Sequence, residues 1–305
     1  MKTKSPETIY RWAKRPVKGL IQLTRYKEYV FFVAVTTMLG AKLGGGQLDL
    51  RLLIVFLANV LVVGFAFMYN DVEDAPDDAL DARKALRNPI SAGMISPTTG
   101  KLACLAVAVL LLALYATLGL MTFALGALCL LLAFLYSWRV ARLKAIPVAD
   151  LISHSLSLAG LQFLCAYFAY DHGKPYGWLL FLSLVFFSVY GELNNEVRDI
   201  EVDQKAGIKH TANLIGLRPT KALMITCVVA GFAVFFAFIA LEFIPWWILL
   251  GPVIIGPMLM APQIWKLIRQ RRSFLDDRES LHNPMVIAGL LTMVIWFVAD
   301  KLPIG

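Results

Sequence analysis

Long apolar runs alternate with short polar segments along almost the whole chain. A helix needs about 20 apolar residues to cross a bilayer, and most of these runs reach that length. The first run is short and contains Lys42. The pattern predicts an all-α membrane protein, a bundle of nine transmembrane helices. The nine runs cover roughly residues 29–44, 51–69, 101–120, 122–138, 148–170, 178–196, 220–243, 245–265 and 282–301.

Positive charge is distributed unevenly over the segments that join these runs. If the N-terminus is cytoplasmic, 25 of the 29 Lys and Arg residues fall on the inner side. Cytoplasmic loops of membrane proteins carry such an excess. We therefore expect a multi-pass integral membrane protein of the cell's inner or plasma membrane, with the N-terminus cytoplasmic and the C-terminus outside. The four remaining charges are Lys42, Arg51, Lys174 and Lys301.

Composition agrees with this picture. The chain is 59% hydrophobic and 16% charged, with a mean hydropathy of +0.68, whereas soluble domains carry about 25% charged residues. No linker divides the chain, so we expect residues 1–305 to form one transmembrane domain, with 1–28 as its basic cytoplasmic segment. The net charge of +8 fits contact with anionic membrane lipid and requires no nucleic acid. The four scattered cysteines argue against zinc and disulfides.

Two acidic segments stand at the inner ends of the second and sixth runs. The first is Asn70-Asp71-Val72-Glu73-Asp74, continuing to Asp78, and the second is Asn195-Glu196-Val197-Arg198-Asp199, continuing to Asp203. In each, Asn, Asp and Asp recur at i, i+4 and i+8, about 40° apart on a helix. Pro76 predicts that the first helix ends or kinks near Ala75. Carboxylates that converge from two helices repel each other unless cations lie between them. The metal-ligand candidates are Asp71, Asp74, Asp78, Glu196, Asp199 and Asp203.

These acids favour metal-bridged diphosphate binding. Mg²⁺ takes one or two carboxylates together with substrate phosphates, and it would neutralise a diphosphate as its bond to an allylic carbon breaks. The apolar bundle would hold a polyprenyl tail and exclude water. On this interpretation the catalytic residues are Asp74, Asp78, Asp199 and Asp203. Diphosphate contacts would come from Asn70, Asn195, Arg83, Lys84, Arg142, Lys144 and Lys209.

The two motifs resemble those of the UbiA superfamily of intramembrane prenyltransferases. Residues 70–78 match its NDxxDxxxD motif, and 196–203 are similar to its second motif, DxxxDxxxD. The stretches 89–96 and 142–144 resemble further family sequences. The resemblance implies a helical bundle with a central cavity open to the cytoplasmic side. It also implies Mg²⁺ dependence, a polyprenyl diphosphate donor and an acceptor attacked at the donor's C1, with release of diphosphate.

The acceptor is open on the sequence. Glu196 stands where the family usually has Asp, and Val140 where the ubiquinone branch has Lys, which argues against a hydroxybenzoate acceptor. A lipid glyceryl phosphate, a quinone precursor, a carotenoid and a tetrapyrrole remain alternatives. Asn59, Asp150 and His154 are polar residues inside apolar runs. They are candidates for an acceptor pocket, the alternative being hydrogen bonds between helices.

A cation transporter or exchanger is the alternative from another class of protein. Transporters also use repeated halves and intramembrane acids, but their sites lie near the bilayer midplane on interrupted helices. The acids of this chain gather at the inner boundary beside basic residues. That position favours chemistry on an anionic substrate, and hence the enzyme.

Overall fold

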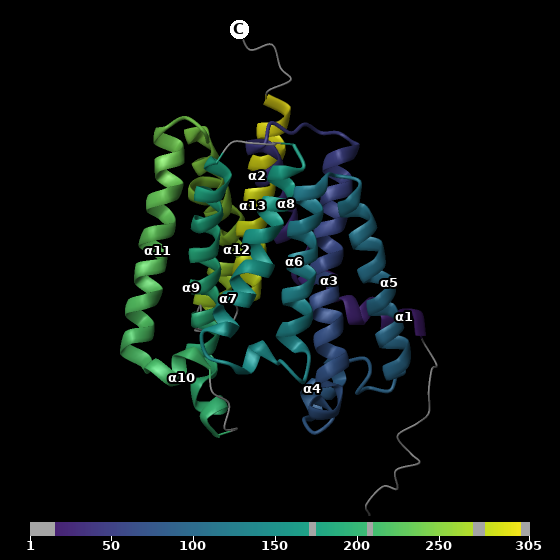
Figure 1. Cartoon of the computed structure of the whole chain (residues 1–305). Coiled ribbons are helices and arrows are strands. Elements are labelled where there is room, and N and C mark those ends of the chain that lie inside the picture. The colour runs from purple at the N-terminus through teal and green to yellow at the C-terminus, as the bar shows by residue number, and fades with distance from the viewer. Residues whose placement is uncertain (1–15, 171–174, 206–209, 271–277, 300–305) are drawn as a thin grey trace, which may run out of the picture.

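A computed structural model describes residues 16–170, 175–205, 210–270 and 278–299, which form helices joined by short turns (Figure 1). The all-α expectation is confirmed. The helices are α1 (Pro16–Thr24), α2 (Val30–Leu43), α3 (Leu50–Asp78), α4 (Ala82–Arg87), α5 (Pro97–Ala116), α6 (Leu120–Ser137), α7 (Ala149–Ser155), α8 (Leu161–Phe168), α9 (Tyr176–Lys205), α10 (Thr211–Ile215), α11 (Leu217–Ala240), α12 (Gly256–Arg269) and α13 (Arg278–Ala299).

Seven helical segments of the described residues are long and apolar enough to cross a membrane, so the chain is a multi-pass membrane protein. The sequence pattern predicts nine. As far as the structure describes them, all nine expected runs are helical, but α2 has 14 residues and the apolar part of α13 covers only Asn283–Ala299. α2 ends early because Gly44, Gly45 and Gly46 follow it. The seven segments are Leu50–Asp78, Pro97–Ala116, Leu120–Ser137, Ala149–Phe168, Tyr176–Arg198, Leu217–Ala240 and Trp246–Arg269.

Polar residues at the helix starts fix where the long helices begin. The Asp49 carboxylate accepts a hydrogen bond from the Leu52 amide at 2.9 Å and caps α3. Ser96 accepts from the Thr99 amide at 2.9 Å and caps α5, whose first residue is Pro97. The sequence thus fixes the start of α3, which carries the first acidic motif, and the start of α5, which follows it in the chain.

The helices differ in how much of their surface is buried. In the apolar windows of α3 and of the α7–α8 segment, 56% and 72% of the residues are buried, against 17% for α11. α3 and α8 therefore form the interior of the bundle. In Figure 1, α11 forms one flank and α5 the other. Their exposed apolar side chains, such as Leu105 on α5 and Phe236 on α11, are suited to contact with lipid.

A buried polar link joins four helices at the centre of the bundle. Asn59 of α3 donates to Thr37 Oγ1 at 2.8 Å and to the Gln162 carbonyl at 3.0 Å. Its own carbonyl oxygen accepts from the Tyr115 hydroxyl at 2.7 Å. Interhelical hydrogen bonds of this kind stabilise membrane bundles. The link fixes α3 against α2, α5 and α8, and so positions the acidic end of α3.

The acidic ends of α3 and α9 lie at the same end of the bundle. In Figure 1, α4 directly follows α3 and α10 directly follows α9, and both are at the bottom of the view. The turn Leu143–Ala145 connects α6 to α7 at this same end. Residues from three distant parts of the sequence are therefore close enough to form one site.

Candidate active site at the shared end of α3 and α9

The first acidic motif lies on one continuous helix. α3 runs through Pro76 and ends at Asp78, so the expectation that Pro76 ends the helix near Ala75 is wrong. Proline lacks an amide donor, so only the helical hydrogen bond to the Val72 carbonyl four residues earlier is lost, and the helix continues to Asp78. The Ser91 hydroxyl donates to the Ala75 carbonyl at 2.7 Å and supports this turn. The i, i+4, i+8 spacing therefore holds along the whole motif.

A lysine already bridges two residues of this motif. Lys144 Nζ, in the turn after α6, lies 2.8 Å from Asn70 Oδ1 and 2.6 Å from Asp74 Oδ2. Arg142 lies 3.5 Å from the other oxygen of Asp74. Burial lowers the pKa of Lys144, and the Asp74 carboxylate opposes this shift. A positively charged group thus occupies the position between Asn70 and Asp74 that the spacing assigns to a cation.

Two arginines of this region have a left-handed backbone. Arg25, between α1 and the turn Tyr26–Glu28, has φ of 48°, and Arg142 has φ of 39°. Side chains other than glycine rarely adopt this conformation. Such residues gather at functional sites, where surrounding contacts hold them in place. Here both arginines are held by carboxylates of the first acidic segment.

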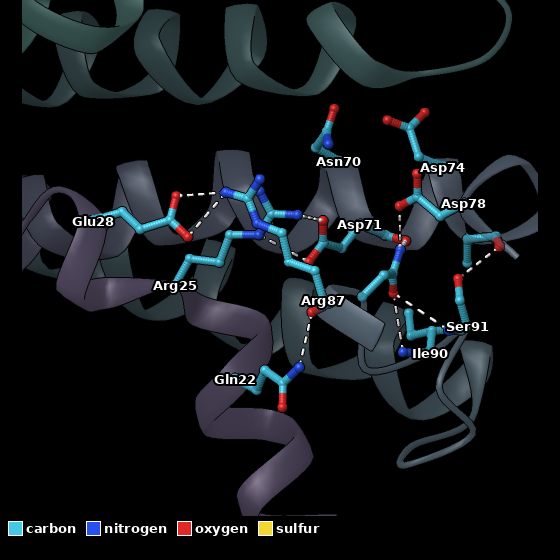
Figure 2. A network of polar contacts seen from close by, with 12 residues as sticks. Gln22, Arg25, Glu28, Asn70, Asp71, Asp74, Asp78, Arg87, Ile90 and Ser91 are labelled. Carbon is cyan, nitrogen blue, oxygen red and sulfur yellow. Dashed lines mark hydrogen bonds and ion pairs between the residues drawn. The ribbon is translucent and has the colours of Figure 1, made fainter. Parts of the chain in front are cut away.

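Asp71 points away from Asn70 and Asp74 (Figure 2). Its carboxylate is fully buried, and both oxygens accept hydrogen bonds from the Arg25 guanidinium, with Nε to Oδ2 at 3.2 Å. A buried ionised carboxylate requires such a partner. The sequence motif places Asp71 among the metal-ligand candidates, but in the structure its carboxylate is bound to Arg25.

An asparagine fastens the loop after α4 to the acidic end of α3. Asn88 Nδ2 donates to the Asp71 carbonyl at 2.8 Å and to Asp78 Oδ2 at 2.9 Å. Asn88 Oδ1 accepts from the Ile90 amide at 3.0 Å (Figure 2). Asn88 is itself fully buried. It fixes the direction of the Asp78 carboxylate.

The segment after α1 is held against the same loop. Gln22 donates to the Arg87 carbonyl at 2.9 Å, and the Arg87 guanidinium pairs with Glu28 at 2.8 Å (Figure 2). The Arg87–Glu28 pair is exposed, in contrast to the buried pair that Arg25 makes. These contacts close one side of the first motif.

The predicted diphosphate contacts on α4 are placed differently. The side chains of Arg83 and Lys84 are exposed, and none of the described contacts joins them to the motif acids. Their backbone amides donate to Asp81, the N-cap of α4, at 2.8 and 3.1 Å. These bonds from Lys84 and Arg83 lower the pKa of Asp81. Arg139 also binds the acidic segment, through the Glu73 carbonyl at 2.8 Å.

A cavity of about 250 Å³ lies beside the acidic face of α3. Its wall is largely apolar, with Val62, Ala66 and Phe67 of α3 among the lining residues. Ser157 and Leu158 reach it from Leu156–Gly160, a wider helical turn of the π type. The polar lining residues are Arg25, Asn70, Tyr136, His154, Ser157 and Glu192. An apolar pocket with a few convergent polar groups is typical of a ligand site.

Two polar residues face each other across this cavity from α7 and α9. His154 Nε2 lies 3.6 Å from Glu192 Oε2, and Asn195 Nδ2 donates to the same oxygen at 3.4 Å. His154, one of the residues predicted for an acceptor pocket, lines this cavity. Asn195 is exposed and reaches the cavity only through Glu192.

The second acidic motif lies on the last turns of α9. Glu196 is buried and accepts from the Ala212 amide at 2.7 Å, next to Asp150 and His210. The side chains of Asp199 and Asp203, and the whole of Lys209, lie outside the described residues.

The other two residues predicted for the acceptor pocket do not line the cavity. Asn59 belongs to the interhelical link described above. Asp150 is 1% exposed and accepts from the Thr211 hydroxyl at 2.9 Å. The structure gives both residues hydrogen bonds between segments, which was the alternative that the sequence left open.

Comparison with known proteins identifies the family of this chain. The model of the UbiA prenyltransferase family matches residues 30–279. The chain belongs to this family. The resemblance of the chain to this family is thereby confirmed.

Two relatives that are named for different activities have the same identity to this chain. Digeranylgeranylglyceryl phosphate synthase of Methanopyrus kandleri is 28% identical over 179 residues, which are 58% of this chain and 62% of the relative. 4-Hydroxybenzoate octaprenyltransferase of Vibrio cholerae is 28% identical over 174 residues, 56% of this chain and 59% of the relative. The match thus spans about three fifths of the length of these relatives.

A solved structure shares the fold over nearly the whole chain. A UbiA homolog from Archaeoglobus fulgidus, solved with GPP and Mg²⁺, has a TM-score of 0.67 and 22% identity. The superposition covers 93% of this chain and 100% of that chain. The bundle described here is therefore the UbiA fold.

The site residues predicted from the sequence did not include four polar residues that line the cavity: Arg25, Tyr136, Ser157 and Glu192. Arg25 is 46 residues from its partner Asp71, and no local pattern links the two. The only signal for Tyr136 was that Tyr136-Ser137, together with residues 142–144, resembles a family sequence. Glu192 carried a signal, because it lies seven residues before Asp199 and so shares its helix face to within about 20°.

Proposed function

We propose that this chain is a Mg²⁺-dependent membrane prenyltransferase. It transfers a polyprenyl group from a polyprenyl diphosphate to a hydrophobic or amphiphilic acceptor and releases diphosphate. The observation that carries the proposal is the Lys144 ammonium between Asn70 and Asp74, beside a largely apolar cavity. Family membership and the homolog solved with GPP and Mg²⁺ support it.

The α3 residues fit a magnesium site. Asn70 and Asp74 each offer an oxygen to a positively charged group, at 2.8 and 2.6 Å, and Asp78 follows one turn later. Oxygen atoms are the ligands that Mg²⁺ prefers. When bound, Mg²⁺ would neutralise the diphosphate and favour its departure as a leaving group. We exclude Asp71 from this set because Arg25 binds both its oxygens.

The α9 side of the site completes the ligand set. The helix is continuous to Lys205, and positions 199 and 203 each fall within about 20° of position 192 on it, to either side. Glu192 lines the cavity, as residues of α3 do. We therefore assign Glu192, Asp199 and Asp203 to the face of α9 that borders the cavity, and keep Glu196 apart from them.

The basic residues hold the diphosphate. Arg25 lines the cavity, and Lys144 and Arg142 lie within 4 Å of Asp74. Lysine and arginine bind phosphate oxygens by charge-assisted hydrogen bonds. Arrival of the diphosphate would draw Lys144 from Asp74 to the phosphate and free the carboxylate. Asn195, Arg83, Lys84 and Lys209 remain further candidates for phosphate contact.

The apolar wall of the cavity receives the first part of the prenyl chain. Its volume of about 250 Å³ is below the range of about 300–1,000 Å³ for typical ligand pockets. A long polyprenyl tail must therefore extend between helices into the bilayer. His154, Tyr136 and Ser157 are the polar groups that would orient the acceptor. The relatives named above act on different acceptors, so acceptor identity is a matter for screening.

We also propose nine membrane crossings in a single domain of residues 1–305. With α2 and the apolar part of α13 crossing as well, the basic loops and the segment 1–28 share the cytoplasmic side. The cavity then opens to that side, where soluble diphosphate leaves. Single cysteines at Leu80 and Glu242 test this orientation. A membrane-impermeant thiol reagent should label position 242 in intact cells and position 80 only after lysis; the reverse pattern would refute it.

The activity test measures diphosphate release from geranylgeranyl diphosphate by purified protein in detergent. A panel of acceptors is offered: glyceryl phosphate lipids, quinone precursors, carotenoids and tetrapyrroles. Asp74→Asn should lower the rate by about 100-fold or more, because charge stabilisation at the leaving group is lost. Asp81→Asn is the matched control, since this exposed residue of the same segment only caps α4. Equal rates in both variants, or ion flux without diphosphate release, would favour the transporter alternative.

A further inference from the structure

A second cluster of ionisable side chains lies outside the cavity. Carboxylate oxygens of Asp150 and Glu196 and an imidazole nitrogen of His210 all lie within 4.8 Å of one another. They come from the start of α7, the last turns of α9 and the residue before α10. Asp150 and Glu196 are 1% and 5% exposed, and none of the three lines the cavity. The cluster is therefore separate from the proposed prenyl-transfer site.

Hydrogen bonds orient both carboxylates, and Asp150 Oδ2 accepts from the Thr211 amide at 3.4 Å. Asp150 Oδ1 accepts from the Leu151 amide at 2.7 Å and from the Thr211 hydroxyl at 2.9 Å. Glu196 Oε2 accepts from the Ala212 amide at 2.7 Å. Carboxylates that bind metal ions are commonly held in this way by outer hydrogen bonds.

Glu196 Oε1 is an independent sign that a partner is missing. This oxygen is buried and accepts no hydrogen bond from any residue that the structure describes. Polar atoms in such surroundings are almost always paired. A second carboxylate, that of Asp150, lies close by, and two buried acids repel each other unless a proton or a cation lies between them.

The spacing and chemistry of the cluster suit one divalent ion. Ligand atoms about 2.1 Å from an ion lie about 3.0–3.4 Å apart in octahedral or tetrahedral geometry. His210 Nδ1 and Asp150 Oδ2 are 3.5 Å apart. Two carboxylates with one imidazole favour Zn²⁺ or a similar transition-metal ion, whereas Mg²⁺ prefers oxygen alone. The His210 side chain is 24% exposed, which lets an ion reach the cluster from water.

We propose that Asp150, Glu196 and His210 bind a structural Zn²⁺ ion, distinct from the Mg²⁺ of the proposed reaction. The scattered cysteines, which argue in the sequence against a zinc site, take no part in it. The ion joins α7 to the end of α9 and to the segment that leads into α10. The proposal rests on the geometry of the cluster and does not depend on prenyl transfer.

The test measures metal content in the full-length protein, purified in detergent and stripped with EDTA. Zn²⁺ is then supplied at one equivalent together with millimolar Mg²⁺, and bound zinc is measured by mass spectrometry after desalting. Wild type should retain about one zinc per chain and unfold at a higher temperature with zinc than without it. His210→Gln should weaken zinc affinity by about 100-fold or more, since even outer-shell changes cost 10–100-fold.

Two control variants make the outcome specific. His154→Gln alters another histidine beside a carboxylate and should bind zinc as wild type does. Asp74→Asn should keep zinc while it loses prenyl transfer, so failure of the zinc site and failure of the proposed function are distinguishable. Because the His210 side chain is partly exposed, its variant should match the unfolding temperature of stripped wild type. Absence of zinc from wild type, or equal affinity in His210→Gln, would overturn the proposal and leave a shared proton between the carboxylates.

Discussion

The acidic ends of α3 and α9 have similar sequences but different surroundings. At the α3 end, Asp74 pairs with the ammonium of Lys144 and the guanidinium of Arg142. At the α9 end, Glu192 lies beside the imidazole of His154, and Glu196 lies in a cluster with a second carboxylate and an imidazole. Ammonium and guanidinium groups thus pair with Asp74 of the first motif, and imidazole groups lie beside Glu192 and Glu196 of α9.

This difference indicates that the two helix ends supply different charged groups to one site. An end where ammonium and guanidinium groups already meet carboxylates is suited to receive an anion, because the bases can turn from the carboxylate to the incoming group. The carboxylates beside the cavity, Asp74 on α3 and Glu192 on α9, are suited to bind cations. A metal diphosphate carries both kinds of charge, and only the two ends together match it.

Of the changes considered, removal of Arg25 should have the largest effect, a loss of folding stability at the α3 end. Arg25→Ala leaves the fully buried Asp71 carboxylate unpaired. Breaking a buried ion pair from one side costs about 3–5 kcal/mol of folding stability. Thermal unfolding in detergent, followed by circular dichroism, measures this loss.

Arg87→Ala is the matched control for Arg25. Its pair with Glu28 is exposed, with 59% and 44% of the two side chains accessible. Surface pairs contribute about 0–1 kcal/mol. If Arg25→Ala and Arg87→Ala unfold at the same temperature, the buried pair does not anchor the first motif.

Removal of Lys144 should have the next largest effect, on catalysis. Lys144→Met deletes the ammonium that bridges Asn70 and Asp74, and kcat/KM should fall by about 100-fold, as for other charge-stabilising groups. Arg139→Met is the control: its guanidinium is 45% exposed, and its loss should change kcat/KM by no more than about fivefold. Steady-state kinetics at saturating Mg²⁺ decide between these outcomes. If the Lys144 variant is as active as the Arg139 variant, the Lys144 ammonium has no part in catalysis.

The smallest expected effect separates the two glutamates of α9. Glu192→Gln should raise the Mg²⁺ concentration for half-maximal activity by about tenfold, since one ligand or its support is weakened. Glu196→Gln should leave that concentration unchanged, because Glu196 lies outside the cavity. Activity measured over a series of Mg²⁺ concentrations tests both. If Glu196→Gln raises this Mg²⁺ concentration and Glu192→Gln does not, then Glu196, and not Glu192, belongs to the Mg²⁺ site.

The sequence was informative where a property depends on residues close together in the chain. Apolar run length predicts all seven candidate spans, and the i, i+4, i+8 spacing predicts the acidic face of α3. Glycines after α2 shorten a helix that apolar content alone makes longer. Pro76 misled because local rules treat it as a stop, whereas it lies in the last turn of a helix that contacts of the following loop support.

The sequence was less informative where a property depends on a distant partner. Periodicity places Asp71 in the acidic motif but does not reveal that Arg25 covers it. Asp150 and His154 share a helix face by spacing, yet one is tied to Thr211 and the other lines the cavity. Which group meets a polar side chain is decided by the packing of helices far apart in the sequence. Such partners need the three-dimensional structure.

The most direct test of the account is a crystal structure with Mn²⁺ in place of Mg²⁺ and an unreactive thio-analogue of geranylgeranyl diphosphate. Anomalous scattering locates the manganese ions independently of the protein. The account predicts ions that bind the diphosphate and take ligands from both helices, Asp74 on α3 and at least one carboxylate of α9. Ions ligated by one helix alone, or a diphosphate bound away from the α3 motif, would contradict it.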